Sequence, residues 1–189
     1  GMGSVRTEPV SGLRVTSPAT TWAMMGALLQ RDDLVALGDA FVREPMRSGD
    51  PFALATIAEL TAALEAGRRR GAVALREALR LVRPRSRSRK ETQTRLVLVD
   101  AGLPEPSLNW PAVVGGRVVA MIDLAYPERK VGFEYEGEHH LTDARQWARD
   151  IRRYEMLADL GWRIIRVPAS DLAHHRADFV KRAHAAFPR

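Results

Sequence analysis

Residues 118–140, VVAMIDLAYPERKVGFEYEGEHH, restrict the fold more than any other part of the chain. Asp123 follows one apolar run, and Glu134 and Glu136 interrupt the next. Because successive strand residues point to opposite faces, Glu134 and Glu136 would share one face while the intervening apolar residues share the other. An apolar strand holds carboxylates mainly where a metal or another cation pairs with them. The pattern therefore predicts two strands with an acidic cluster at the rim of their sheet.

Composition limits the class of protein. The chain has 189 residues, of which 46% are hydrophobic, so it can form one domain with an accessory segment or two small domains. The absence of cysteine excludes disulfides, cysteine-ligated zinc and thiol catalysis, and it suits a reducing cytoplasm. The sequence has no run of 18 apolar residues and no charged-then-apolar leader. We therefore expect a cytoplasmic protein with no membrane partner.

The net charge of +6 is concentrated in the first half of the chain. Arginine is dense in RRR at 68–70 and in RPRSRSRK at 83–90. Such density is typical of a protein that contacts the phosphates of a polyanion. The same stretch also fits a solvated linker. The sequence leaves both readings open, and the residues predicted to contact such a polyanion are Arg85, Arg87, Arg89 and Lys90.

The chain divides near residue 86. Residues 1–86 read as a small all-α module, with Asp32 or Asp33 capping a helix and a capping box at Thr56 and Glu59. Residues 87–189 read as an α/β domain. Its expected elements are a helix at 88–101, strands at 110–114, 117–125 and 130–136, a helix at 142–160, a strand at 162–168 and a helix at 170–186.

The helix expected at 142–160 rests on the spacing of four side chains. Trp147, Ile151, Tyr154 and Ala158 recur at intervals of four, three and four residues, which places them on one helix face. Gly161 follows as a C-cap. A strand then precedes the closing helix, so the α/β domain runs helix, three strands, helix, strand, helix.

This order and several short motifs resemble one group of nucleases. SRKE, AGLPEP, IDLAYP, FEYEGEHH, ARDIRRYEML and GWRIIRV are similar to the very-short-patch-repair-endonuclease-like branch of the PD-(D/E)XK superfamily, whose actinobacterial members often have a helical region upstream. The similarity covers about Ser88 to Leu172. It implies a restriction-endonuclease-like mixed β-sheet flanked by helices. It also implies a metal-dependent endonuclease that acts on DNA.

The resemblance assigns catalytic roles to five residues. Asp123 and Glu134 match the acidic metal ligands of the family motif. Glu136 stands at the position of the family's lysine and is the third expected metal ligand. His140 matches a histidine of the branch, with His139 beside it, and Glu91 matches a glutamate of the preceding helix. Glu91 is equally explained as the partner of a helix cap.

The helix after the acidic segment adds a basic pair. Asp150 and Arg153 match a frequent Asp-x-x-Arg pair of the family, and Arg149 and Arg153 are the phosphate contacts expected from this helix. Pairing of these arginines with Glu155 along the helix is the simpler alternative.

Phosphodiester hydrolysis explains why these residue types would gather. Mg²⁺ or Mn²⁺ held by carboxylates stabilises negative charge on phosphate oxygens and lowers the pKa of a bound water. A neutral histidine nearby can accept or donate a proton near pH 7. No Gly-rich nucleotide loop is present, and we expect no organic cofactor.

Two other function classes remain open, as does the oligomeric state. One is a nuclease-fold module that binds DNA without cleaving it, which the missing lysine favours. The other is a carboxylate/histidine metal enzyme acting on a small molecule, which the pI of about 10.4 disfavours. A domain with a single site often dimerises to cut both strands, so a homodimer is also considered, although no dimer seam is visible in the sequence.

Overall fold

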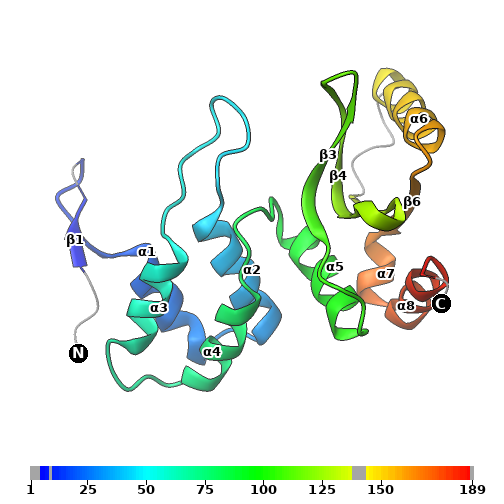
Figure 1. The fold of residues 1–189 in the computed structure, drawn as a ribbon. Coiled ribbons are helices and arrows are strands. Elements are labelled where there is room, and N and C mark those ends of the chain that lie inside the picture. Colours follow the sequence, from blue (N-terminus) through cyan, green and yellow to red (C-terminus); the bar gives the residue numbers. More distant parts are fainter. Residues whose placement is uncertain (1–4, 9, 138–143, 188–189) are drawn as a thin grey trace. The chain divides into compact units, whose positions relative to one another are not determined.

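A computed structural model of the chain describes residues 5–8, 10–137 and 144–187. These residues form two compact units, 1–92 and 93–189. The division falls inside helix α5 (Arg89–Asp100), a short way beyond the break that the composition predicts (Figure 1).

The first unit is mainly helical. The expectation of an all-α module is wrong for its first residues, because β1 (Val5–Thr7) pairs with β2 (Arg14–Thr16) as a short antiparallel ladder. The remaining elements of this unit are α1 (Pro18–Met24), η1 (Met25–Ala27), α2 (Arg31–Val42), α3 (Ile57–Glu65) and α4 (Ala72–Leu81).

Two helix starts in this unit follow the capping rules, and another departs from them. At the start of α1, the Ser17 hydroxyl accepts a hydrogen bond from the N–H of Thr20. The capping box at Thr56 and Glu59 is confirmed, with both reciprocal hydrogen bonds present. The prediction that Asp32 or Asp33 caps α2 is wrong, because Gln30 occupies the N-cap position. Both aspartates lie instead in the first turn, where negative charge interacts favourably with the helix dipole.

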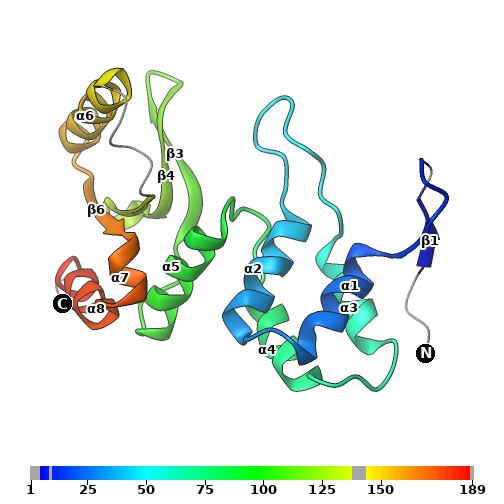
Figure 2. The same cartoon turned by 180° about the vertical axis from the view of Figure 1, so that it is seen from behind.

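The second unit has the predicted α/β order, except that the closing helix is split in two (Figures 1 and 2). After α5 come β3 (Ser107–Val114), β4 (Arg117–Tyr126), η2 (Pro127–Arg129), β5 (Val131–Glu136), α6 (Ala144–Asp159), β6 (Arg163–Pro168), α7 (Ala169–Ala173) and α8 (Arg176–Ala185).

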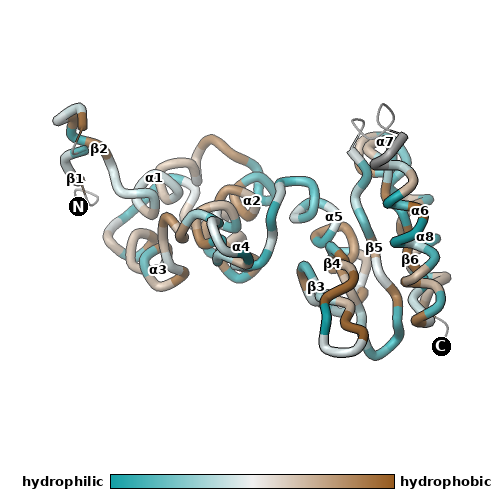
Figure 3. The backbone as a smooth tube through the Cα atoms, turned by 90° about the horizontal axis from the view of Figure 1, so that it is seen from above, coloured by the Kyte–Doolittle hydropathy of each residue, from teal (hydrophilic) through white to brown (hydrophobic). Residues whose placement is uncertain are grey.

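The four strands form one mixed sheet in the order β3-β4-β5-β6. The pairs β3/β4 and β4/β5 are antiparallel, whereas β5 and β6 are parallel. The parallel pair requires a crossover, and α6 supplies it. Much of β4, an interior strand of the sheet, is hydrophobic (Figure 3).

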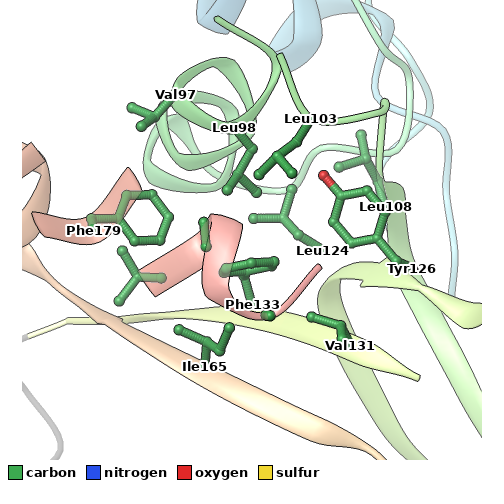
Figure 4. Close-up of a cluster of buried hydrophobic side chains, with 13 residues drawn as sticks. Val97, Leu98, Leu103, Leu108, Leu124, Tyr126, Val131, Phe133, Ile165 and Phe179 are labelled. Carbon is green, nitrogen blue, oxygen red and sulfur yellow. The ribbon is translucent and has the colours of Figure 1, made fainter. Parts of the chain in front are cut away.

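Helices cover both faces of the sheet. On one face, Val97 and Leu98 of α5 and Phe179 of α8 pack with Phe133 and Ile165 of the sheet (Figure 4). The rings of Phe133 and Phe179 meet edge to face, with centroids 5.9 Å apart.

On the opposite face the cluster of buried hydrophobic residues is smaller, and α6 covers it. Leu157 of this helix packs with Ile122 of β4 and with Trp162, which precedes β6. The second unit is thus a mixed α/β layer structure, and the acidic strands lie at its centre. Of the described residues, none belongs to a helix long and apolar enough to cross a membrane.

Candidate functional site

The site begins where β4 and β5 separate. Their antiparallel ladder runs from Tyr126 opposite Val131 to Leu124 opposite Phe133, and its pairing ends there. Continuing the register by one residue would place Asp123 opposite Glu134. The Asp123 carboxylate instead accepts a hydrogen bond from the backbone N–H of Tyr135, at 3.2 Å. A side-chain oxygen thus accepts from a backbone N–H of β5 beyond the end of the ladder.

Glu134 is the most deeply buried acid of the site, with 4% of its surface exposed. Arg153 donates to both of its carboxylate oxygens, at 2.9 and 2.6 Å, and the hydroxyl of Tyr154 donates to one of them at 2.8 Å. A buried carboxylate is tolerated only when such partners replace the lost water. The fork geometry of arginine fits a carboxylate with two parallel hydrogen bonds.

Glu136 lies two residues further along β5 and forms an ion pair with Arg166 of β6. Two guanidinium groups lie over the ring of Tyr154, that of Arg153 at 4.7 Å and that of Arg166 at 5.4 Å from the ring centroid. Burial, followed by the charge of Glu134, raises the pKa of the Tyr154 hydroxyl. The hydrogen bond to Glu136 raises the pKa of Arg166.

These side chains line one pocket of about 500 Å³. The pocket brings together the three acids that the sequence predicts as metal ligands. Within residues 5–8, 10–137 and 144–187, no three acids or histidines converge closely enough to form a ready-made metal cage. The polar side chains that line the pocket are Asp123, Glu134, Tyr135, Glu136, Asp150, Arg153, Tyr154, Arg166 and Ser170.

Two of the five predicted catalytic residues are not placed in this pocket. His140, with His139, lies outside the described residues. Glu91 belongs to the first unit, where its N–H donates to the Ser88 hydroxyl at 3.1 Å and its carboxylate accepts from the N–H of Arg87 at 3.0 Å. These bonds match the capping interpretation closely. The catalytic assignment of both residues stays a prediction.

The arginines predicted to contact DNA are largely paired within the fold. Arg87 donates to both oxygens of Asp50, at 2.9 and 3.2 Å, and this hydrogen bond lowers the pKa of Asp50. Arg89 pairs with Asp33 at 2.6 Å, and Arg153 is held by Glu134. Partners are also present for Arg85, Lys90 and Arg149.

Tyr154 and Arg166 are site residues that the sequence did not single out. Tyr154 was counted only as part of the helix periodicity. Arg166 had a usable signal, because it is a charged residue inside the apolar strand RIIRV. Its role depends on the parallel register of β5 and β6, which pairs it with Glu134 in the ladder.

The pKa of Tyr154 gives a testable pH dependence. Because its pKa in the folded state is raised above the ordinary value of 10.0, the folded state holds its proton more tightly than the unfolded state. The free energy of unfolding should therefore be insensitive to this group below pH 10 and should fall as the pH rises above it. We expect Tyr154→Phe to make this alkaline decline shallower. Urea unfolding at pH 8–11 measures it, and an unchanged slope would contradict the assignment.

Two curated proteins of Mycobacterium tuberculosis are similar to the chain. They are Uncharacterized protein MT2308 of strain CDC 1551 / Oshkosh and Uncharacterized protein Rv2248 of strain ATCC 25618 / H37Rv. Each is 33% identical over 167 residues, which cover 88% of this chain and 59% of the relative. The chain thus spans less than two thirds of the length of these relatives. No family model matches the sequence, and no solved structure matches it.

Proposed function

We propose that residues 93–189 form a restriction-endonuclease-like domain that hydrolyses DNA phosphodiester bonds with a divalent metal ion. One observation carries the proposal: Asp123 and Glu134 lie where two central strands separate, in one pocket with Glu136. The motif resemblance assigns the metal to these same three carboxylates. The mixed sheet with helices on both faces agrees with the expected fold class.

The donor set of the pocket fits Mg²⁺ or Mn²⁺ in chemical type. Both ions prefer carboxylate and water oxygens, and Mg²⁺ often needs only one or two carboxylates from the protein. Asp123 and Glu134 would hold the ion, with Glu136 beside them. An ion bound there would stabilise charge on the scissile phosphate and acidify a bound water.

Arg166 could take over the role of the lysine that the family motif has and this chain lacks. Glu136 replaces that lysine, yet Arg166 on the neighbouring strand forms an ion pair with Glu136. A guanidinium therefore lies near the place where the family has an ammonium group. We propose that Arg166 orients the phosphate and offsets its charge, while Tyr154 holds Glu134 in position through its hydroxyl.

A second candidate function is a DNA-binding module that does not cleave. It is favoured by the state of the carboxylates, because Glu134 and Glu136 already have arginine partners. A carboxylate offers about four acceptor positions, and Arg153 and Tyr154 use three of those on Glu134. Metal binding must use the remaining position or displace Arg153.

Calorimetric titration with Mg²⁺ and Mn²⁺, followed by incubation with plasmid DNA, separates the two functions. Saturable metal binding together with metal-dependent nicking or linearisation supports the nuclease. Salt-dependent DNA binding without heat of metal binding supports the module. Absence of both would overturn the two proposals together.

DNA as the partner is supported by a group of exposed arginines in the first unit. Arg68 and Arg70 lie in the turn before α4, and Arg76 and Arg80 lie on its exposed side. None of the four has an ion-pair partner among the residues that the structure describes. Two acids, Glu65 and Glu77, are nearby on the adjoining helices. Unlike Arg87, these arginines are available to phosphate.

The salt dependence of DNA binding tests this surface. We expect Arg76→Gln/Arg80→Gln to weaken binding and to lower the slope of log K against log salt by roughly 2, because each phosphate contact contributes about 0.9. A matched control is Arg14→Gln/Arg47→Gln, which removes the same charge from two isolated, exposed positions of the same unit. Equal slopes for the two variants would mean that only net charge matters.

A further inference from the structure

One asparagine occupies the same row of the sheet as the candidate metal ligands. In the β3/β4 ladder, Leu108 pairs with Leu124 and Trp110 pairs with Ile122, so Asn109 comes opposite Asp123. The β3/β4 ladder skips the pair Asn109/Asp123, and on the other side of β4 the β4/β5 ladder ends just before the pair Asp123/Glu134.

The row therefore crosses all four strands. Asn109 stands on β3, Asp123 on β4 and Glu134 on β5, and Glu134 pairs in register with Arg166 on β6. Asn109 is the only uncharged member, and 5% of its surface is exposed. A buried polar side chain inside a strand costs free energy unless its groups are bonded, so its retention beside the acids requires a reason.

The backbone of Asn109 is strained. Its φ is +47°, in the left-handed region that non-glycine residues seldom adopt and never need in a regular strand. Asparagine tolerates this region better than most residues. Elsewhere in the described chain, Lys130 is the one other non-glycine residue with positive φ, and it lies in the exposed turn before β5. Strain of this kind is retained mainly at functional sites.

In β4, opposite Asn109, the regular alternation of side chains between the two faces of the sheet is interrupted at Asp123. Ile122 packs in the cluster under α6, whereas Leu124 packs in the cluster under α5 and α8. In a regular strand these two residues would share one face. The chain of β4 therefore turns at Asp123, and this turn lets the Asp123 carboxylate bond the N–H of Tyr135.

We infer that Asn109 is a positioning residue for Asp123: the left-handed backbone at 109 and its buried amide set the direction of the Asp123 carboxylate. An amide side chain carries two N–H donors, the groups that can hold a carboxylate across a strand pair. The consequence for metal binding rests on the proposed function. The consequence for the contact between Asp123 and Tyr135 does not.

Two substitutions separate the backbone role of Asn109 from its amide role. Asn109→Gly permits the same φ without strain and removes only the amide, whereas Asn109→Ala keeps the strain and removes the amide. Lys130→Gly is the matched control, because it relieves a positive φ away from the pocket. Asp123→Ala is the positive control, since it deletes the acceptor of the Tyr135 N–H.

Amide hydrogen exchange at Tyr135 is the first measurement. In Asn109→Gly we expect exchange to be at least about tenfold faster, approaching the rate in Asp123→Ala, because the acceptor is no longer held. Lys130→Gly should leave the rate unchanged. A wild-type rate at Tyr135 in Asn109→Gly would overturn the inference, because the amide would then play no part in holding the Asp123 carboxylate.

Metal affinity is the second measurement. Loss of a group that orients a metal ligand weakens binding by about 10- to 100-fold, and we expect Asn109→Gly to fall in that range for Mn²⁺. If the wild type binds no metal, the proposed function fails while the exchange result still decides the role of Asn109. If the wild type binds and Asn109→Gly binds equally, the positioning role fails by itself.

Discussion

Asp123→Asn/Glu134→Gln is expected to abolish Mg²⁺ and Mn²⁺ binding and to reduce DNA cleavage by at least about 1,000-fold. Both substitutions keep the size of the side chain and one acceptor oxygen, so the bond from Tyr135 and one of the two bonds from Arg153 can persist. What they remove is the negative charge that holds a divalent cation. A catalytic metal supplies several kcal/mol of transition-state stabilisation, which corresponds to this loss in rate.

Calorimetry and plasmid cleavage with the purified 189-residue chain measure the effect. Glu155→Gln is the control, because it neutralises an exposed acid on α6 that does not line the pocket. The control should cleave at the wild-type rate. If the double variant cleaves at that rate too, the metal site is not at Asp123 and Glu134. If the wild type binds DNA but neither binds metal nor cleaves, the non-cleaving module is the better description.

The acidic cluster was accessible from the sequence because alternation in a strand is a local property. The two-residue spacing of Glu134 and Glu136 predicts that both side chains lie on one face of the strand, and in the structure both line the same pocket. The order of elements in the second unit followed from periodicity and turn residues in the same way.

Features that depend on register or on tertiary neighbours were not accessible. Trp147 shares the helical spacing of Ile151, yet 63% of its surface is exposed, because periodicity indicates a face without saying how far the neighbouring sheet extends. The strain at Asn109 and the pairing of Arg166 arise only when separate strands are aligned. No local pattern marks the strain at Asn109, and the charge of Arg166 within RIIRV does not reveal its partner.

The cationic stretch shows the same limit. Its density predicted phosphate contacts, but Arg87 and Arg89 find Asp50 and Asp33, which lie far away in sequence. Composition counts charges and cannot tell which of them the fold has already paired. The local density of arginine gave no reason to prefer the arginines of α4 over those of residues 83–90. Because the fold leaves Arg76 and Arg80 without ion-pair partners among the described residues, they are the better candidates for contacts with DNA.

Arg153→Met should lower the free energy of unfolding of the second unit by about 3 kcal/mol at pH 7. Breaking a buried ion pair leaves an uncompensated charge, which costs about 3–5 kcal/mol, and the partial exposure of Arg153, at 30%, favours the lower end. For a unit of this size the melting temperature should fall by more than about 10 °C. Thermal unfolding followed by circular dichroism measures it.

The neighbouring variant Arg152→Met provides the control, because the Arg152 side chain is exposed and donates to the carbonyl of Ala148. It should change stability little. Arg153→Met/Glu134→Gln should recover most of the loss, since it removes the buried charge along with its partner. Mg²⁺ discriminates further: a cation that binds Glu134 must restore more stability to Arg153→Met than to the wild type, because in the variant it replaces the lost guanidinium. Equal stabilisation of both proteins by Mg²⁺ would mean that the ion binds away from Glu134. Arg153 would then be the permanent counter-ion of Glu134, as the non-cleaving module requires.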